Sequence, residues 1–343
     1  MNPPARGDGR NLDRRLVDER GEGATFEVSE PDAAWPVAPD ATPEVGPDAG
    51  PDAGPDGATA TPSDTYYDLP VVKAAPWKGF IPAYFYLGGL AGAAATLAAA
   101  AELAGDHARA RDLHWIAALG DAAGAVCLVA DLGRPSRFHY MMRVFRPTSP
   151  MNLGTWILSG AAFTGGLALL RSLRGRRGPG VVGVASAVTG SMLSTYTGVL
   201  VGNTAIPVWA STRRRLPVWF AASSAASLAS LLEVVRGSAP RPYSVLAKAA
   251  EVVTTVAVER AAATAGVDRP LRTGRSGRMW RGAKWLGLAS LAATVLRRPR
   301  LAGVLGTAAA LLGRFAIVDA GQASAADPRA TFEPQRRAAA RRA

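Results

Sequence analysis

The residues with the clearest chemical potential lie in one long connection between two apolar runs, DLGRPSRFHYMMRVFRPTSPMNLGTW at 131–156. Its charged and titratable side chains are Asp131, Arg134, Arg137, His139, Arg143 and Arg146. Guanidinium groups attract negative charge on a partner protein or on a ligand. The alternative interpretation is that these arginines only fix membrane topology and bind anionic lipid headgroups.

Ionisable side chains inside apolar runs are the next candidates, because they are costly in a bilayer and usually face the interior of a helix bundle. Asp121 lies in the middle of such a run, where its side chain cannot easily reach the interface. Asp131 and Arg134 follow at the end of the same run. Such residues favour either a proton relay or a polar cofactor pocket, and Asp121, Asp131 and Arg134 are our candidates for a relay.

Later apolar runs also contain charged residues. Lys248 and Glu259 are eleven residues apart, which is close to three helical turns and places them on one helix face. They favour either a proton relay or a polar pocket. Glu233 and Arg236 lie at the end of another run, and we expect their side chains to extend to the membrane interface.

Tyr196 lies within the apolar stretch SMLSTYTGVLVGNTAIPVW at 191–209. A tyrosine hydroxyl in an apolar helix bundle can hydrogen-bond a ligand carbonyl. The alternative role is an aromatic anchor at the membrane interface. The sequence alone leaves both roles open.

Histidine and cysteine usage argues against a resident metal. The three histidines, His107, His114 and His139, lie in or next to connections, so no two can face each other as axial ligands of a haem. Cys127 is the single cysteine, whereas an iron–sulfur cluster usually takes four thiolates. We expect neither haem nor any other metal in this chain.

Eight apolar runs approach the length of about 20 residues that crosses a bilayer. They are residues 80–103, 113–131, 153–170, 181–203, 217–235, 244–263, 283–297 and 300–319. The pattern predicts an all-α polytopic membrane protein with eight transmembrane helices and excludes a soluble enzyme. The arginines gather between the runs rather than on a face of a folded unit, which is typical of membrane proteins and excludes nucleic-acid binding.

Small residues recur at four-residue spacing in the early runs, which lets membrane helices approach closely. The positions are Gly88 and Gly92, Gly120 and Gly124, and Gly190, Ser194, Gly198 and Gly202. We therefore expect the first four helices to form one tight bundle.

Composition divides the chain into four segments. Residues 1–64 hold 14 acidic residues against five arginines and include a GPDA repeat at 46–57, so we expect a disordered acidic tail. Residues 65–215 should form the first four-helix bundle, and residues 216–320 a second helical bundle. Residues 321–343 should form a basic C-terminal tail.

The distribution of basic residues predicts the orientation in the cell membrane. The connections on the side of the two chain ends, with the adjoining segments 65–79 and 320–343, hold 19 Lys and Arg against 11 on the other side. The positive-inside rule then places both termini in the cytoplasm.

Three stretches together resemble the NrfD/polysulfide reductase membrane subunit family. They are YYDLPVVKAAPWKGFIPAYFYLGGLAGAAATLA at 66–98, DLGRPSRFHYMMRVFRPTSPMNLGTWIL at 131–158 and YTGVLVGNTAIPVW at 196–209. The resemblance implies a haem-free membrane anchor that reacts with quinone, with menaquinone as the expected type. It further implies a four-cluster iron–sulfur subunit and a molybdopterin catalytic subunit as partners, in addition to membrane lipid.

The resemblance also implies roles for individual residues. Tyr196 matches the tyrosine of the family's YTG motif, which contributes to a quinone pocket in the first four-helix bundle. Arg134, His139 and Asp131 would line the rim of that pocket, while Arg137, Arg143 and Arg146 would dock the iron–sulfur subunit. Several relatives have a polar residue where this chain has Ile81 and Pro82, so the second half of the quinone contact is not assigned.

Two other functions are compatible with the same sequence. An ion or small-molecule transporter would have broken helices at matching positions of two inverted halves, and no such repeat is visible. A structural membrane anchor would have no quinone site, so that Tyr196 would be dispensable for electron transfer.

Overall fold

The computed structural model describes residues 72–77, 79–132 and 134–332, and these residues contain helices but no strand. They belong to one compact unit, Pro62–Ala343. The expected acidic tail at 1–64, with its GPDA repeat, lies outside the described residues. So do residues 333–343 of the expected basic tail.

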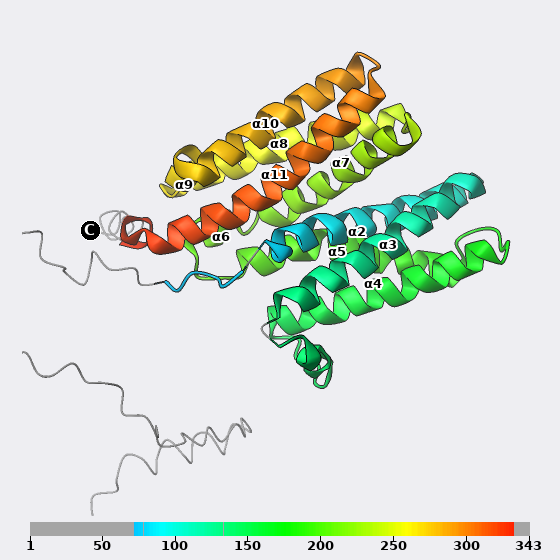
Figure 1. Ribbon diagram of the computed structural model, residues 1–343, viewed down its shortest axis with the longest axis horizontal. Coiled ribbons are helices and arrows are strands. Elements are labelled where there is room, and N and C mark those ends of the chain that lie inside the picture. The colour runs from blue at the N-terminus through cyan, green and yellow to red at the C-terminus, as the bar shows by residue number, and fades with distance from the viewer. Residues whose placement is uncertain (1–71, 78, 133, 333–343) are drawn as a thin grey trace, which may run out of the picture. The chain divides into compact units, whose positions relative to one another are not determined.

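Eight long helices lie side by side in the described unit (Figure 1). They are α2 (Phe80–Leu103), α3 (His107–Asp131), α4 (Pro150–Leu173), α5 (Gly180–Gly202), α7 (Leu216–Arg236), α8 (Arg241–Ala265), α10 (Gly274–Val295) and α11 (Pro299–Ala326). Three short helices lie in the connections: the 3-10 helix η2 (Pro135–Met142), α6 (Pro207–Thr212) and α9 (Arg269–Arg272). The short helices share one end of the unit, because every second connection returns to the same side (Figure 1).

Six of the long helices are long and apolar enough to cross a membrane, namely α2, α3, α4, α5, α7 and α11. The other two, α8 and α10, have similar lengths but contain more charged side chains, among them Lys248, Glu251 and Lys284. Each of the eight apolar runs in the sequence coincides with one long helix.

Three helix boundaries differ from those expected from hydropathy. Helix α3 begins at His107 rather than near 113, because the Asp106 side chain caps it by accepting a hydrogen bond from the Arg109 amide (3.1 Å). Helix α10 begins at Gly274 rather than near 283, since its first turns are basic and invisible to an apolar pattern. Helix α11 continues to Ala326, into the segment assigned to the C-terminal tail.

Helix α2 is the central element of the described unit. It contacts α3, α4 and α5, and on its other side α7 and α11. Its crossing with α5 depends on two glycines, since a Cβ at Gly190 would lie 2.8 Å from the Gly92 carbonyl oxygen. Backbones in such direct contact gain van der Waals packing, which is the main attraction available to helices in lipid.

An aromatic cluster joins the early helices to the later ones. Trp77, just before α2, stacks on Trp209 of α6 with ring centroids 5.1 Å apart. Phe85 of α2 meets Phe220 of α7 edge to face at 5.5 Å. These contacts, with those of α2, connect the first four helices to the later helices of the described unit.

The Gly92–Gly190 contact yields a stability prediction with a matched control. We expect Gly190→Ala to lower the free energy of unfolding by about 1–3 kcal/mol, because the new methyl group overpacks the α2–α5 crossing. Gly166 of α4 faces open space, so Gly166→Ala should be neutral or stabilising by up to about 1 kcal/mol. Thermal unfolding of both variants in detergent measures this difference, and equal midpoints would contradict it.

Candidate functional site

The connection between α3 and α4 forms an exposed surface, which we call the arginine loop (residues 134–149). The side chains of Arg134, Arg137, His139, Arg143 and Arg146 are all exposed. Large apolar side chains alternate with them and are 36–58% exposed: Phe138, Tyr140, Met142, Val144 and Phe145. Arginine and aromatic residues are enriched in protein–protein interfaces, and an exposed apolar patch of this kind marks an interaction site.

Aromatic and cationic groups order the arginine loop internally. The His139 and Tyr140 rings meet edge to face at 4.5 Å, and the Arg143 guanidinium lies over the Tyr140 ring at 5.6 Å. The Phe145 ring contacts Trp156 of α4 edge to face at 5.9 Å. The loop therefore presents a defined surface rather than a set of independent side chains.

Asn152 holds the arginine loop against the start of α4. Its side-chain amide donates to the carbonyl oxygens of Met141 (2.7 Å) and Val144 (2.9 Å), and its Oδ1 accepts from the Arg146 amide (2.7 Å). Ser149 caps α4, with its hydroxyl accepting a hydrogen bond from the Asn152 amide at 3.5 Å. The three loop contacts of Asn152 have no signature in the sequence.

Tyr196 is buried on α5, and its hydroxyl donates a hydrogen bond to the Pro150 carbonyl in the first turn of α4. Its ring lies against Gly154, where a Cβ would come within 2.9 Å of Tyr196 Cε1. The structure thus places Tyr196 at the base of the arginine loop. Gly154 is a necessary part of this arrangement that the sequence analysis did not identify.

Asp121 lies deep between α3, α4 and α5, and its side chain is buried. A Cβ at Gly165 would lie 3.5 Å from Asp121 Oδ2 and 3.8 Å from the Ser186 hydroxyl. Neither Asp121 Oδ1 nor the Ser186 hydroxyl has a hydrogen-bond partner within the described ranges. Asp121 and Ser186 therefore form a small buried polar cluster beside Gly165.

The three residues of the expected relay do not lie together. Asp131 is at the C-terminal end of α3 and Arg134 is exposed in the arginine loop. The ten residues from Asp121 to Asp131 correspond to a helical rise of about 15 Å. Any proton path between them needs further groups or water.

Buried charges in the later helices form an ion pair that the sequence analysis missed. Lys248 Nζ of α8 lies 2.5 Å from Glu233 Oε2 of α7 and 2.9 Å from the Thr294 hydroxyl of α10. The side chains of Lys248 and Glu233 are 1% and 3% exposed, so the expectation that Glu233 reaches the interface was wrong. A charge at this depth is tolerated because its partner neutralises it.

Lys248 and Glu259 share one face of α8, as expected from their spacing, because both side chains bond to residues of α10. The Glu259 carboxylate accepts hydrogen bonds from Lys284 (2.8 Å) and from the Trp280 indole (3.0 Å).

Arg314 of α11 is fully buried and donates to the Phe220 carbonyl at 3.0 Å. Its guanidinium also lies 4.0 Å from the Phe220 ring centroid, a cation–π contact.

Histidine placement also differs from the expectation. His114 is buried inside α3, and its Nε2 lies 3.1 Å from Glu102 Oε1 of α2. Within residues 72–77, 79–132 and 134–332, no group of three or more His, Cys, Asp or Glu side chains is placed to hold a metal ion.

The role of Asn152 is open to a direct test. We expect Asn152→Ala to speed tryptic cleavage within the arginine loop up to about 100-fold, because three hydrogen bonds of about 1 kcal/mol each no longer oppose local opening. Asn152→Asp, which keeps the acceptor for the Arg146 amide, should be intermediate. Thr155→Ala is the control, since the Thr155 hydroxyl bonds only to the Met151 carbonyl within α4. Equal cleavage of the Asn152 and Thr155 variants would contradict the assignment.

Comparison with known proteins places the chain in a family. The family model described as polysulfide reductase, NrfD type, matches residues 63–327, which cover all the long helices. A search of curated proteins finds no match. Members of this family assemble with the catalytic and iron–sulfur subunits of oxidoreductases. With its apolar helices and a family match over most of its length, this multi-pass membrane protein belongs to the NrfD polysulfide reductase family.

Proposed function

We propose that the chain is the quinone-reactive membrane subunit of an oxidoreductase complex, and that electrons pass between its iron–sulfur partner and membrane quinone. The observation that carries the proposal is the position of Tyr196. Its hydroxyl bonds to the first turn of α4, at the base of an exposed cationic and aromatic loop. A group at this position lies between a surface suited to a protein partner and the membrane-spanning helices.

The arginine loop is proposed as the docking surface for a four-cluster iron–sulfur subunit, which in turn carries a molybdopterin catalytic subunit. Arg137, Arg143 and Arg146 provide exposed positive charge beside Phe138 and Phe145. Charge complementarity speeds encounter and fixes register, while the aromatic side chains supply buried contact area. The clamp by Asn152 fixes the loop before binding, which lowers the ordering cost of association.

The residues around Tyr196 fit a quinone. A quinone headgroup is flat and needs a hydrogen-bond donor at a carbonyl, and it exchanges two electrons and two protons when it reacts. The Tyr196 hydroxyl has one donor hydrogen, which bonds to the Pro150 carbonyl in the structure and would turn to a quinone carbonyl on binding. Gly154 leaves the Tyr196 ring free of a neighbouring Cβ. Met151 and Trp156 on the adjoining turns of α4 are exposed apolar groups. Arg134, His139 and Asp131 are proposed at the rim, where positive charge stabilises a reduced headgroup, and menaquinone is the proposed type.

Proton transfer is proposed to use Asp121 in the interior, with Asp131 and Arg134 at the end of α3. Asp121 supports this role because its carboxyl group is buried next to the Ser186 hydroxyl and α4 offers it no side chain at Gly165. Ionisable groups inside a membrane bundle are expensive and typically serve proton or ion pathways.

We further propose that all eight long helices cross the membrane and that both termini are cytoplasmic. The charges of α8 and α10 do not prevent crossing, since Lys248 is neutralised by Glu233, and Lys284 by Glu259. The end of the unit that carries the arginine loop also carries the basic connections at 203–215 and 266–273, as the positive-inside rule requires of a cytoplasmic face.

Ion transport is a second candidate function, favoured by the buried charges of the later helices. Lys248, Glu233 and Arg314 lie inside the bundle, where charged groups often line ion or proton pathways. Under this alternative, a change at Tyr196 would leave the activity intact.

The quinone proposal predicts a selective loss of activity. We expect Tyr196→Phe to lower quinone-linked electron transfer by the purified complex about 10- to 100-fold, the equivalent of one hydrogen bond to a charged group. Tyr243→Phe is a matched control, because the Tyr243 hydroxyl of α8 also donates to a backbone carbonyl, that of Ala225 (3.1 Å). Both variants should assemble normally. Full activity in the Tyr196 variant would support a structural anchor or a transporter instead.

The docking proposal predicts a loss of the iron–sulfur partner. We expect the double change Arg137→Glu and Arg143→Glu to reduce the iron that copurifies with the tagged chain at least about ten-fold, and to make retention more sensitive to salt. The same charge change at Arg176 and Arg177, exposed in the connection between α4 and α5 at the other end of the unit, is the control. Similar iron content in the two double variants would exclude the arginine loop as the docking surface.

A further inference from the structure

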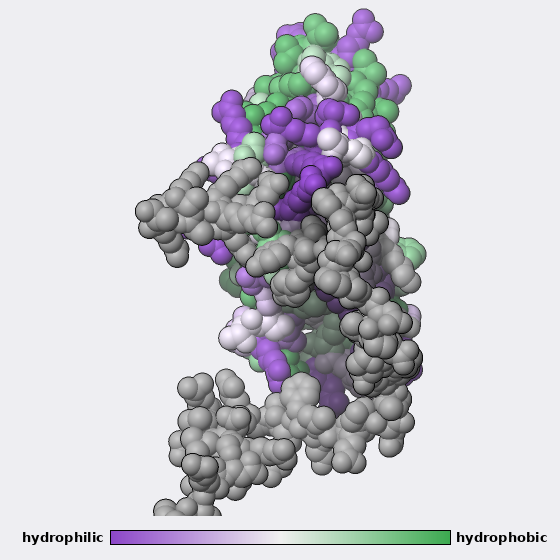
Figure 2. Space-filling view, turned by 90° about the vertical axis from the view of Figure 1, so that its left-hand side faces the viewer, coloured by the Kyte–Doolittle hydropathy of each residue, from purple (hydrophilic) through white to green (hydrophobic). Residues whose placement is uncertain are grey.

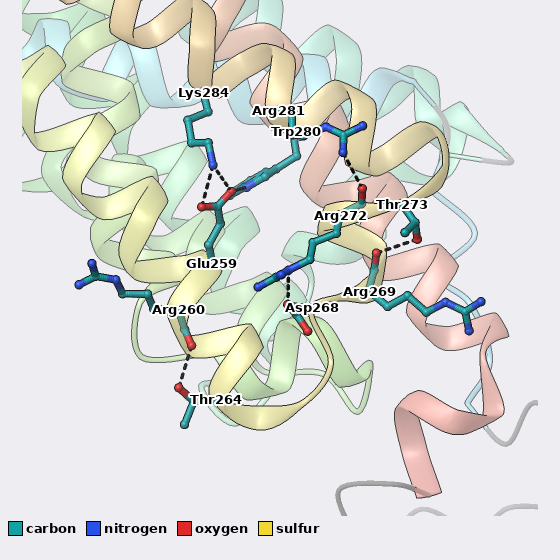
Figure 3. A network of polar contacts seen from close by, with 10 residues as sticks. All are labelled: Glu259, Arg260, Thr264, Asp268, Arg269, Arg272, Thr273, Trp280, Arg281 and Lys284. Atoms are coloured by element: carbon teal, nitrogen blue, oxygen red, sulfur yellow. Dashed lines mark hydrogen bonds and ion pairs between the residues drawn. The ribbon is translucent and has the colours of Figure 1, made fainter.

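A cavity with excess positive charge lies at the end of α8 and α10, and we call it the cationic cavity. Its volume is about 430 Å³. Its charged lining residues are Glu259 and Arg260 of α8, Asp268 and Arg272 beside and within α9, and Arg281 and Lys284 of α10 (Figure 3). Helix α8 ends at Ala265, so the cavity lies near the end of the helical unit, where lipid headgroups meet a membrane protein.

The charges of the cationic cavity do not balance. Lys284 engages Glu259, with Nζ 2.8 Å and 2.9 Å from the two carboxylate oxygens, and Arg272 pairs with Asp268. Arg260 and Arg281 remain as two further positive charges. Arg281 Nη1 is held by the Arg272 carbonyl at 3.0 Å. The lining thus contains four cations and only two carboxylates, and both carboxylates are already engaged, which favours an anionic ligand.

An apolar groove continues from the cationic cavity along the outer face of α8. It has a volume of about 900 Å³ and is lined by α8 residues from Val252 to Ala265, with Ser211 and Arg215 beside it. Val256 and Arg260 line both spaces, and the Arg260 guanidinium points away from the Glu259–Lys284 pair (Figure 3). We call this space the α8 groove.

We propose that the cationic cavity and the α8 groove together bind one anionic phospholipid, with its phosphate in the cavity and an acyl chain in the groove. A small soluble anion would use only the cationic cavity, and a neutral lipid would leave the positive charge of that cavity unmatched. Hydrophilic residues gather on this end of the unit among hydrophobic ones (Figure 2), as expected where a protein meets the headgroup region. Basic pockets beside membrane helices are suited to phosphate headgroups.

The test uses the full chain, purified in a neutral detergent, stripped of lipid and titrated with phosphatidylglycerol or phosphatidylcholine. Native mass spectrometry measures the affinity for each lipid. We expect clear preference for phosphatidylglycerol, and a loss of about 25-fold in its affinity when Arg260→Gln and Arg281→Gln are combined, since each cation near the headgroup contributes about five-fold. Arg278→Gln combined with Arg300→Gln removes the same charge outside the cavity and should keep the preference.

Two further arms identify the ligand. Ala257→Trp fills the α8 groove without removing a charge, and it should weaken phosphatidylglycerol binding while the charged residues of the cationic cavity stay in place. Inorganic phosphate should give no rise in the thermal unfolding midpoint at concentrations where phosphatidylglycerol does. A rise with phosphate equal to that with the lipid would assign a soluble anion instead. Equal phosphatidylglycerol affinity in the cavity and control double variants would overturn the proposal.

Discussion

The direct backbone contact between α2 and α5 at Gly92 and Gly190 is the constraint on which the rest of the structure depends. Helix α5 is also held from the side of α7, where a Cβ at Gly198 would lie 2.7 Å from the Pro217 Cα. Fixed by glycines on two sides, α5 has a defined rotation. That rotation directs Tyr196 toward α4, where a third glycine, Gly154, leaves space for its ring.

The glycine contacts that fix α5 also determine the position of the arginine loop. The Tyr196 hydroxyl meets the first turn of α4, and two residues beyond Pro150 the Asn152 side chain clamps the loop. The surface that we propose for a partner and a buried hydroxyl are thereby linked through one helical turn. The small residues at the helix crossings therefore do more than allow close packing. They also fix the position of the buried Tyr196 side chain relative to the exposed loop.

Asp121 in the early helices and Lys248 in the later ones are two buried ionisable groups with different surroundings. In the early helices, the buried Asp121 carboxyl has Gly165 and Ser186 as neighbours and keeps one oxygen without a described partner. In the later helices, Lys248 is matched with Glu233. A matched pair resists a change of protonation state, since removing one charge leaves the other buried without a partner. A single carboxyl group can change its protonation state at lower cost, which suits a proton relay.

Local sequence signals predicted more of this protein than long-range ones did. Hydropathy located all eight long helices, but it missed the start of α3, which depends on the Asp106 cap, and the basic first turns of α10. Tyr196 is a candidate because of a motif, whereas the contact of Gly154 with its ring follows only from the approach of α5. Glu233 was wrongly expected at the interface, because nothing in the sequence shows that its partner is Lys248, which lies fifteen residues away on a different helix. Pairings between helices have no periodic signature in a single sequence.

The two cationic regions at one end of the unit show why a count of arginines does not identify a partner. In the arginine loop the cations alternate with exposed aromatic side chains, such as Phe138 and Phe145, which provide rigid contact area for a folded protein. In the cationic cavity the cations adjoin a groove along α8 that is lined mainly by valine and alanine, which matches a flexible hydrocarbon chain. The proposed cytoplasmic orientation accounts equally for the positive charge of both regions. In the two proposals, the apolar groups beside each set of charges are what distinguish a protein partner from a lipid.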